Sequence, residues 1–248
     1  MRTESVLVFT NERLVQSRIR LGRLATLAGF LALGAGLIFS LQTQAQNQPD
    51  LALLLSYGGL LLGLFFFSLA KYNALRFGIR PPIHEILSRE LRGLDYKYRL
   101  YNYIEGIPVD HLLVSPFGLT VIETRPFIGH IINRGQKWSR KGGLFRILQF
   151  LSEGALGNPS RDAQRGVRAV RALLAERLGA ERAAAVPVEG VVVFTHPRVV
   201  LEVTDPVVPV LHVRELRAHL RRPNGRTRLP LDLQRQVVQV FDDIKQAA

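Results

Sequence analysis

Two long apolar stretches dominate the hydropathy pattern of the first 70 residues. The first, LATLAGFLALGAGLIFSL, runs from Leu24 to Leu41, and the second, LALLLSYGGLLLGLFFFSLA, runs from Leu51 to Ala70. Neither contains a charged residue, and at about 1.5 Å per helical residue each can cross a hydrocarbon core of ~30 Å. The pattern predicts a transmembrane helical hairpin over residues 21–71 (spans 24–41 and 51–70), preceded by a lead over residues 1–20.

Basic residues flank the pair of apolar spans and do not occur in the polar loop between them, residues 42–50. They are Arg13, Arg18, Arg20 and Arg23 before the first span, and Lys71, Arg76 and Arg80 after the second. Positively charged flanks stay in the cytoplasm, so we expect a two-pass cell-membrane protein whose termini and main domain are cytoplasmic. An alternative remains: Leu24 to Leu41 followed by Thr43-Gln44-Ala45 loosely resembles a signal peptide with its cleavage site.

Neither apolar stretch holds an ionisable residue, which favours an anchor in the lipid bilayer over a transporter. Small residues recur in both stretches, at Ala28, Ala32 and Gly36 and at Gly59 and Gly63. Because small residues let helices approach closely in lipid, these faces allow a homo-oligomer. They are equally consistent with the ordinary abundance of Gly and Ala in such helices.

After Pro81-Pro82 the pattern changes to alternating helices and short strands. Helical spacing covers residues 83–94, and Asn158-Pro159 begins a second helix that extends to about Gly179. Strand-type runs occupy 98–104, 109–115, 119–125, 130–133, 186–194 and 208–213, and short helices follow near 215–221 and 233–246. This order predicts an α/β domain over residues 80–248, with a central mixed sheet flanked by helices.

Charge and composition narrow the function further. The net charge of +13 favours contact with phosphate, either of nucleic acid or of anionic lipid. The absence of cysteine excludes a disulfide framework, a zinc ribbon and a thiolate nucleophile.

The segment Ser115-Pro116-Phe117-Gly118 is a tight-turn signal between two predicted strands. With a two-residue connection, Asp110 lies opposite Glu123, and Arg125 lies on the same face. Two close carboxylates need a cation, either this guanidinium or a divalent metal, and oxygen ligands suit Mg²⁺ or Mn²⁺. A three-residue connection with a bulge would instead place the two acids on opposite faces.

These residues belong to a longer pattern: VDHLLVSPFGLTVIETR from Val109 to Arg125, Gly129-His130-Ile131, Asn158-Pro159, and VEGVVVFT from Val188 to Thr195. The pattern resembles the nuclease-related domain (NERD) family over about residues 80–222. That family is similar to PD-(D/E)xK phosphodiesterases, in which Asp, Glu and Lys surround a divalent metal. The resemblance implies that Asp110 and Glu123 are the metal carboxylates and Glu85 the helix glutamate, with no small-molecule cofactor.

Two positions depart from the family pattern. Arg125 replaces the lysine of the E-x-K motif, and Asp162 stands where the family tends to have Gln. Arginine stays protonated, so it could stabilise charge on a phosphate but could not act as a base. Arg161 and Arg165 begin a basic helix face that could bind phosphate or could simply be solvated.

Two functions therefore remain open from the sequence. One is a metal-dependent nuclease acting on DNA, with Asp162, Arg161 and Arg165 near the substrate. The other is a degenerate nuclease fold that binds nucleic acid or protein at the membrane. A third reading, a basic surface that binds anionic lipid, rests on charge alone.

Overall fold

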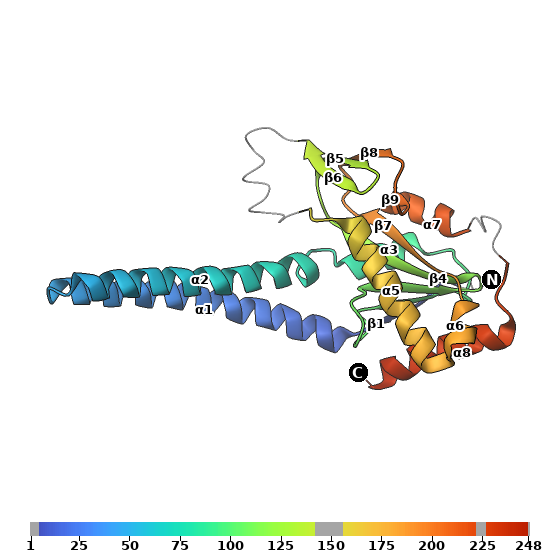
Figure 1. The fold of residues 1–248 in the computed structure, drawn as a ribbon, viewed down its shortest axis with the longest axis horizontal. Helices are drawn as coiled ribbons and strands as arrows, with labels where there is room; N and C mark the ends of the chain where they lie inside the picture. Colours follow the sequence, from blue (N-terminus) through green and yellow to red (C-terminus); the bar gives the residue numbers. More distant parts are fainter. Residues whose placement is uncertain (1–4, 142–155, 222–226, 248) are drawn as a thin grey trace. The chain divides into compact units, whose positions relative to one another are not determined.

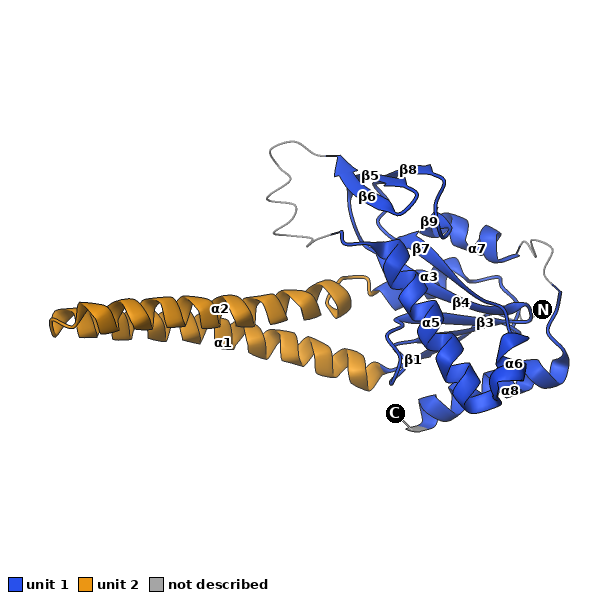
Figure 2. Ribbon diagram, viewed as in Figure 1, with its two compact units in different colours: residues 1–11, 83–248 blue, residues 12–82 orange. Residues whose placement is uncertain are grey.

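The computed structural model describes residues 5–141, 156–221 and 227–247. The chain divides into two compact units, one of residues 12–82 and one of residues 1–11 together with 83–248 (Figure 2). The unit of residues 12–82 is therefore inserted into the chain of the larger unit, between residue 11 and residue 83. The sequence analysis had assigned residues 1–11 to a lead.

The smaller unit is a helical hairpin of α1 (Glu12–Ala45) and α2 (Pro49–Phe77). Both helices are long and apolar enough to cross a membrane, and only 17% and 11% of their most apolar windows are buried within the protein. Leu31 is 73% exposed, and Leu54 and Leu61 are each 67% exposed. Helices from a soluble core would bury these side chains, so the hairpin fits a membrane anchor.

Small residues bring α1 and α2 together within this one chain. A Cβ atom added to Gly59 would lie 2.7 Å from the Cα atom of Gly36, and one added to Gly63 would lie 2.6 Å from Leu33 Cγ. Beside them the hydroxyl of Ser56 donates a hydrogen bond to that of Ser40 over 2.6 Å. The glycines that suggested a homo-oligomer are thus occupied by the intramolecular contact, because close backbone packing needs their missing side chains.

The larger unit contains the expected mixed sheet. Its strands, in spatial order, are β1 (Leu7–Thr10), β2 (Arg99–Asn102), β3 (His111–Ser115), β4 (Gly118–Arg125), β7 (Val188–Phe194) and β9 (Val210–His212) (Figure 1). Strand β3 runs antiparallel to β2 and β4, whereas the pairs β1–β2, β4–β7 and β7–β9 are parallel.

Strand β1 is the main departure from the expected organisation. Residues 7–10 do not remain in a lead but pair with residues 99–102, and the Asn11 N–H extends the ladder to the Asn102 carbonyl over 3.2 Å. A four-residue edge strand followed after one residue by a helix leaves little alternation to detect. Cleavage near Ala45 would remove this strand, so the signal-peptide alternative conflicts with the fold.

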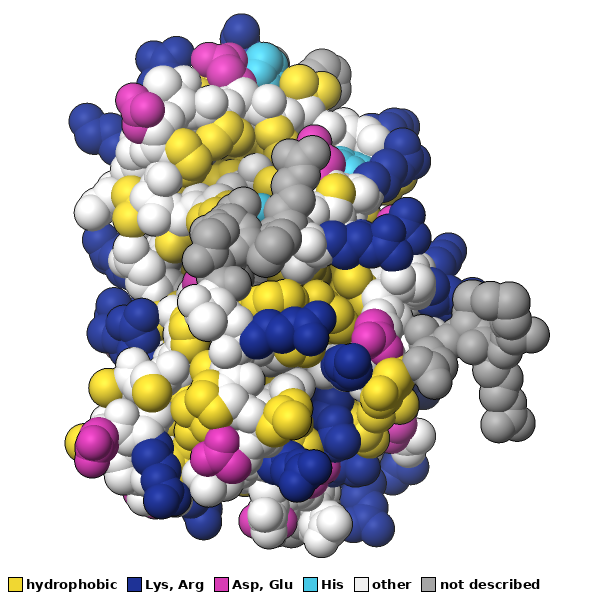
Figure 3. All heavy atoms as spheres, turned by 90° about the vertical axis from the view of Figure 1, so that its right-hand side faces the viewer, with side chains coloured by type: hydrophobic (Ala, Val, Ile, Leu, Met, Phe, Trp, Pro, Cys, Tyr) yellow, Lys and Arg dark blue, Asp and Glu magenta, His cyan; other side chains and the backbone are white. Residues whose placement is uncertain are grey.

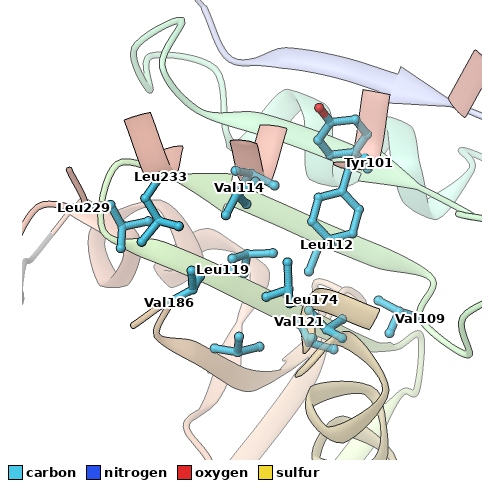
Figure 4. Close-up of a cluster of buried hydrophobic side chains, with 14 residues drawn as sticks. Tyr101, Val109, Leu112, Val114, Leu119, Val121, Leu174, Val186, Leu229 and Leu233 are labelled. Atoms are coloured by element: carbon cyan, nitrogen blue, oxygen red, sulfur yellow. The ribbon is translucent and has the colours of Figure 1, made fainter. Parts of the chain in front are cut away.

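One face of the sheet packs against α5 (Pro159–Leu178) and α8 (Leu231–Ala247). Figure 4 shows the cluster beneath these helices, in which Leu112 and Val121 from the strands lie near Leu174 of α5. At its rim, Asp242 of α8 accepts hydrogen bonds from the Tyr101 hydroxyl over 2.8 Å and from Arg99 over 2.7 Å. These polar contacts fix α8 on the edge of the apolar core.

The opposite face carries Leu100, Leu113 and Ile122, all at most 1% exposed. Helix α3 (Ile83–Glu90) packs on this side through His84, whose ring meets Tyr103, which in turn contacts His111. Among the described residues, the unit also contains the short helices α6 (Ala180–Ala184) and α7 (Val213–Arg221). The sheet is therefore covered by helices on both faces, as the sequence predicted.

A second sheet of three strands has the order β6 (Lys137–Lys141), β5 (Gly129–Arg134) and β8 (Val199–Thr204). Its buried face packs through Ile131 and Trp138 against Phe194 of β7. The sequence analysis predicted β5 but not β6 or β8. Both are half-exposed strands with mixed polar composition, so their periodicity is weak.

The hairpin predicts a specific cross-link. Because the chain has no cysteine, Ser40→Cys combined with Ser56→Cys should oxidise in membranes to an intramolecular disulfide, detected as a monomer of altered electrophoretic mobility. The control pairs Ser40→Cys with Tyr57→Cys, since Tyr57 is 62% exposed. Disulfide-linked dimers from the first pair, or equal cross-linking in the control, would contradict the intramolecular packing.

Candidate functional site

The turn between β3 and β4 sets the geometry of the site. Ser115 pairs with Gly118 and His111 pairs with Ile122, which confirms the two-residue connection. Gly118 has a φ of +128°, and a Cβ atom there would lie 2.4 Å from the Pro187 carbonyl oxygen. Only glycine fits this position without strain, because both the backbone conformation and the space exclude a side chain.

Continued by one residue beyond His111 and Ile122, this register sets Asp110 opposite Glu123. The Tyr103 N–H donates to the Asp110 carbonyl over 2.7 Å, so the neighbouring backbone continues the ladder. Burial raises the pKa of Glu123 above its ordinary value, Arg125 partly opposes the shift, and the charges of Asp110 and Asp162 add to it. The register and this charge effect are both consistent with the predicted convergence of the two acids, which stays a prediction.

Arg125 lies between two carboxylates. Its guanidinium donates hydrogen bonds to Glu123 Oε1, to Asp162 Oδ2 over 2.7 Å, and to the Thr124 carbonyl over 3.0 Å. The side chains of Arg125 and Glu123 are only 17% and 19% exposed. A largely buried, bridged arrangement of this kind holds the guanidinium in one position, in contrast to a solvated surface pair.

Helix α5 supplies Asp162 because its N-terminus is fixed near the end of β4. Asn158 caps the helix by accepting the Arg161 N–H over 3.0 Å, as the Asn-Pro signal predicted. Close approach to the sheet depends on Gly166, where an added Cβ atom would lie 2.8 Å from Val121 Cγ1. The sequence analysis named Asp162 but gave this glycine no role.

The other candidate residues divide into two groups. Arg165 joins the cluster, since its guanidinium lies 3.4 Å from Asp162 Oδ1. Arg161 is exposed on the first turn of α5. Glu85 is exposed in the first turn of α3. A role for Glu85 at this site therefore rests only on the resemblance.

The acidic donors at this site are carboxylate oxygens, the ligand type that hard divalent cations prefer. Asp110, Glu123 and Asp162 carry three negative charges when ionised, against the positive charges of Arg125 and Arg165. Across the described ranges, no group of three acidic or histidine side chains has a metal-binding arrangement. Mg²⁺ nevertheless often binds through one or two carboxylates, with water and phosphate completing its shell. The pair Asp110 and Glu123 is the candidate for such a site, with Glu123 already paired with Arg125.

His111 lies next to the acidic pair but on the opposite face. It is 1% exposed, and its Nδ1 atom is 2.8 Å from the Asn102 side-chain oxygen. Asn102 in turn donates to the Thr10 hydroxyl of β1 over 3.0 Å. This histidine is a packed, hydrogen-bonded residue that links β3 to the sheet edge.

Comparison with known protein families gives one match. Residues 84–195 match the family model of the nuclease-related domain (NERD), which spans α3 to β7 and includes all the candidate site residues. The match confirms the resemblance found in the sequence, although it ends before β8, β9, α7 and α8. Searches of curated proteins and of solved structures give no match to the chain.

The raised pKa of Glu123 predicts a pH-dependent stability difference. The folded state holds this proton more tightly than the unfolded chain, so the carboxylate lowers the free energy of unfolding as pH rises through the raised pKa. A Glu123→Gln variant cannot ionise at this position, so its free energy of unfolding does not fall in this way. Its stability relative to the original chain should therefore increase from about pH 4 to about pH 7, as measured by urea unfolding followed through the single tryptophan, Trp138.

Glu202→Gln is the control for this measurement. Hydrogen bonding to Arg134 lowers the pKa of Glu202, so its substitution should give a trend of the opposite sign. A stability difference between Glu123→Gln and the original chain that does not change with pH would contradict the assignment.

Proposed function

We propose that this chain, whose residues 84–195 form a nuclease-related domain, is a membrane-anchored nuclease that needs a divalent metal and acts on DNA phosphodiesters. The observation that supports the proposal is the two-residue turn between β3 and β4, because its register, continued by one residue beyond His111 and Ile122, sets Asp110 opposite Glu123. The charge of Asp110 also contributes to the raised pKa of Glu123. These two carboxylates would hold Mg²⁺ or Mn²⁺. The ion, when bound, would supply positive charge to the scissile phosphate and activate water.

The chain's own residues have separate roles in this proposal. Arg125 keeps Glu123 in position. Three of its five N–H groups donate to Glu123, Thr124 and Asp162, and the other two would stabilise negative charge on a phosphate. It cannot take a proton from water, because a guanidinium stays protonated. Arg161 and Arg165 add positive charge at the N-terminus of α5, where phosphate is favoured. A slow enzyme is expected, since no lysine assists the attacking water.

The fold also supports a common side for both ends of the anchor. Strand β1 precedes the hairpin and is hydrogen-bonded to β2, which follows it. If α1 and α2 both cross the membrane, the residues before α1 and after α2 must therefore lie on the same side. The basic flanks then favour the cytoplasmic side for the nuclease-related domain.

The nuclease proposal is tested with the full chain in detergent micelles, because a fragment that begins after the hairpin would lack β1. Supercoiled DNA with Mn²⁺ should be cut, and Asp110→Asn or Glu123→Gln should each lower the rate by at least about 100-fold, since each removes a metal ligand. Glu202→Gln, an acid of the second sheet, should leave the rate unchanged. Cutting that persists in Asp110→Asn would overturn the assignment.

A second function is favoured by one specific observation. Arg125 forms ion pairs with both Glu123 and Asp162, and a bound cation of this kind can stabilise a degenerate site. The domain would then bind nucleic acid or a protein partner at the membrane without hydrolysis. Figure 3 shows Lys and Arg side chains spread over the face of the protein that it presents, a distribution consistent with contacts to phosphate.

The two functions differ in their response to salt and to Arg125→Lys. A binding module should retain DNA in filter-binding assays at low salt, lose most of this affinity between about 50 and 200 mM salt, and cut no DNA with Mn²⁺. Arg125→Lys restores the lysine of the family motif, so it should raise the cutting rate of a nuclease but create none in a degenerate fold. DNA retention that does not depend on salt would exclude the binding function.

A further inference from the structure

A hollow on the first three turns of α1 is lined by side chains that the nuclease proposal does not use. It has a volume of about 410 Å³, and its walls are Arg13, Gln16, Ser17, Arg20, Leu21 and Leu24. All of these residues belong to α1, between its first turn and the start of the apolar span.

The hollow faces away from the partner helix. Its polar residues recur at three-, four- and seven-residue spacing from Arg13, which places them on one side of the helix. The residues that α1 buries in this region are Val15, Gly22 and Ala25. At about 100° of rotation per residue these fall on the opposite side from Arg13 and Arg20. The hollow is therefore on the side of α1 that is turned away from α2, at the end of the helix that leads into the apolar span.

The lining changes from polar to apolar along the helix axis. Arg13, Gln16, Ser17 and Arg20 offer two guanidinium groups, an amide and a hydroxyl, and all four residues are exposed. Leu21 and Leu24 follow, with exposures of 37% and 63%. Arginine binds phosphate through paired charge-assisted hydrogen bonds, and the amide and hydroxyl can bind the hydroxyl groups of glycerol. The leucines can contact acyl chains.

We propose that this face of α1 binds the headgroup of a phosphate-bearing anionic lipid in the leaflet that surrounds the N-terminal end of α1. The phosphate lies between Arg13 and Arg20, and the acyl chains pass over Leu21 and Leu24. The sequence of polar and then apolar contacts along one face distinguishes a phospholipid from free phosphate, which would make no use of the leucines. The site depends on the membrane anchor and is independent of nuclease activity.

The test uses the full chain in mixed micelles of a neutral detergent with either phosphatidylglycerol or phosphatidylcholine. Retained lipid is measured by mass spectrometry after washing. The original chain should retain phosphatidylglycerol in preference to phosphatidylcholine. Arg13→Gln combined with Arg20→Gln should lower this retention about tenfold, which is the order of one charge-assisted hydrogen bond to phosphate.

The matched control combines Arg18→Gln with Arg23→Gln. It removes the same charge from the same helix but leaves the hollow intact, because neither residue lines it. Both double variants are first compared by circular dichroism to confirm equal helix content. The control should retain phosphatidylglycerol nearly as the original chain does.

Three results would overturn the proposal. Equal loss in both double variants would show a general effect of charge, and equal retention of the two lipids would show no headgroup preference. Inorganic phosphate that raises the melting temperature in lipid-free micelles as much as phosphatidylglycerol does would identify a site for free phosphate instead.

Discussion

The pairing of β3 with β4 is the constraint on which the candidate site depends. Because side chains alternate between faces, a slip of one residue would move Glu123 to the other face and turn Thr124 toward α5. Gly118 prevents such a slip, since its backbone conformation and its closeness to the Pro187 carbonyl both require the absence of a side chain. The Leu119 N–H donates to the same carbonyl over 2.9 Å, so the turn is also tied to the residue that precedes β7.

The acidic site is held together at a cost to stability. A buried carboxylate with a raised pKa is disfavoured in the folded state, and two further acids nearby increase the cost. Arg125 offsets part of it through its contacts with Glu123 and Asp162. Removing Arg125 would leave the buried charge of Glu123 uncompensated. The resulting loss of stability would exceed the net contribution of the Arg125–Glu123 ion pair to the free energy of unfolding. Such a cluster in an otherwise apolar interface is typical of a site retained for function.

The insertion of the hairpin between β1 and the rest of the domain links anchoring to folding. The sheet is complete only when residues before α1 return to pair with residues after α2. Asn102 strengthens this link, since it contacts both Thr10 of β1 and His111 of β3. The anchor is therefore part of the connectivity of the domain, and a fragment lacking the hairpin and the N-terminus would expose an edge of the sheet at β2.

Much of this arrangement is determined locally and can be predicted from the sequence. The two apolar spans follow from the absence of charge over helical lengths, α5 from its Asn-Pro start, and the strand pair from a turn with glycine at its fourth position. The choice between the two possible registers of that turn was not determined by the sequence. It depends on the Pro187 carbonyl, which comes from a segment about 70 residues away.

Tertiary structure decided the features that need distant segments to meet. The pairing of β1 with β2, across the whole hairpin, has no signal in the sequence of residues 7–10, because a short edge strand gains its stability from its partner. The role of Arg125 as the shared partner of Glu123 and Asp162 depends on how closely α5 approaches β4, which Gly166 permits. The sequence by itself determined which residues could carry charge and which could enter lipid. Their partners were decided only by packing, which local patterns do not encode.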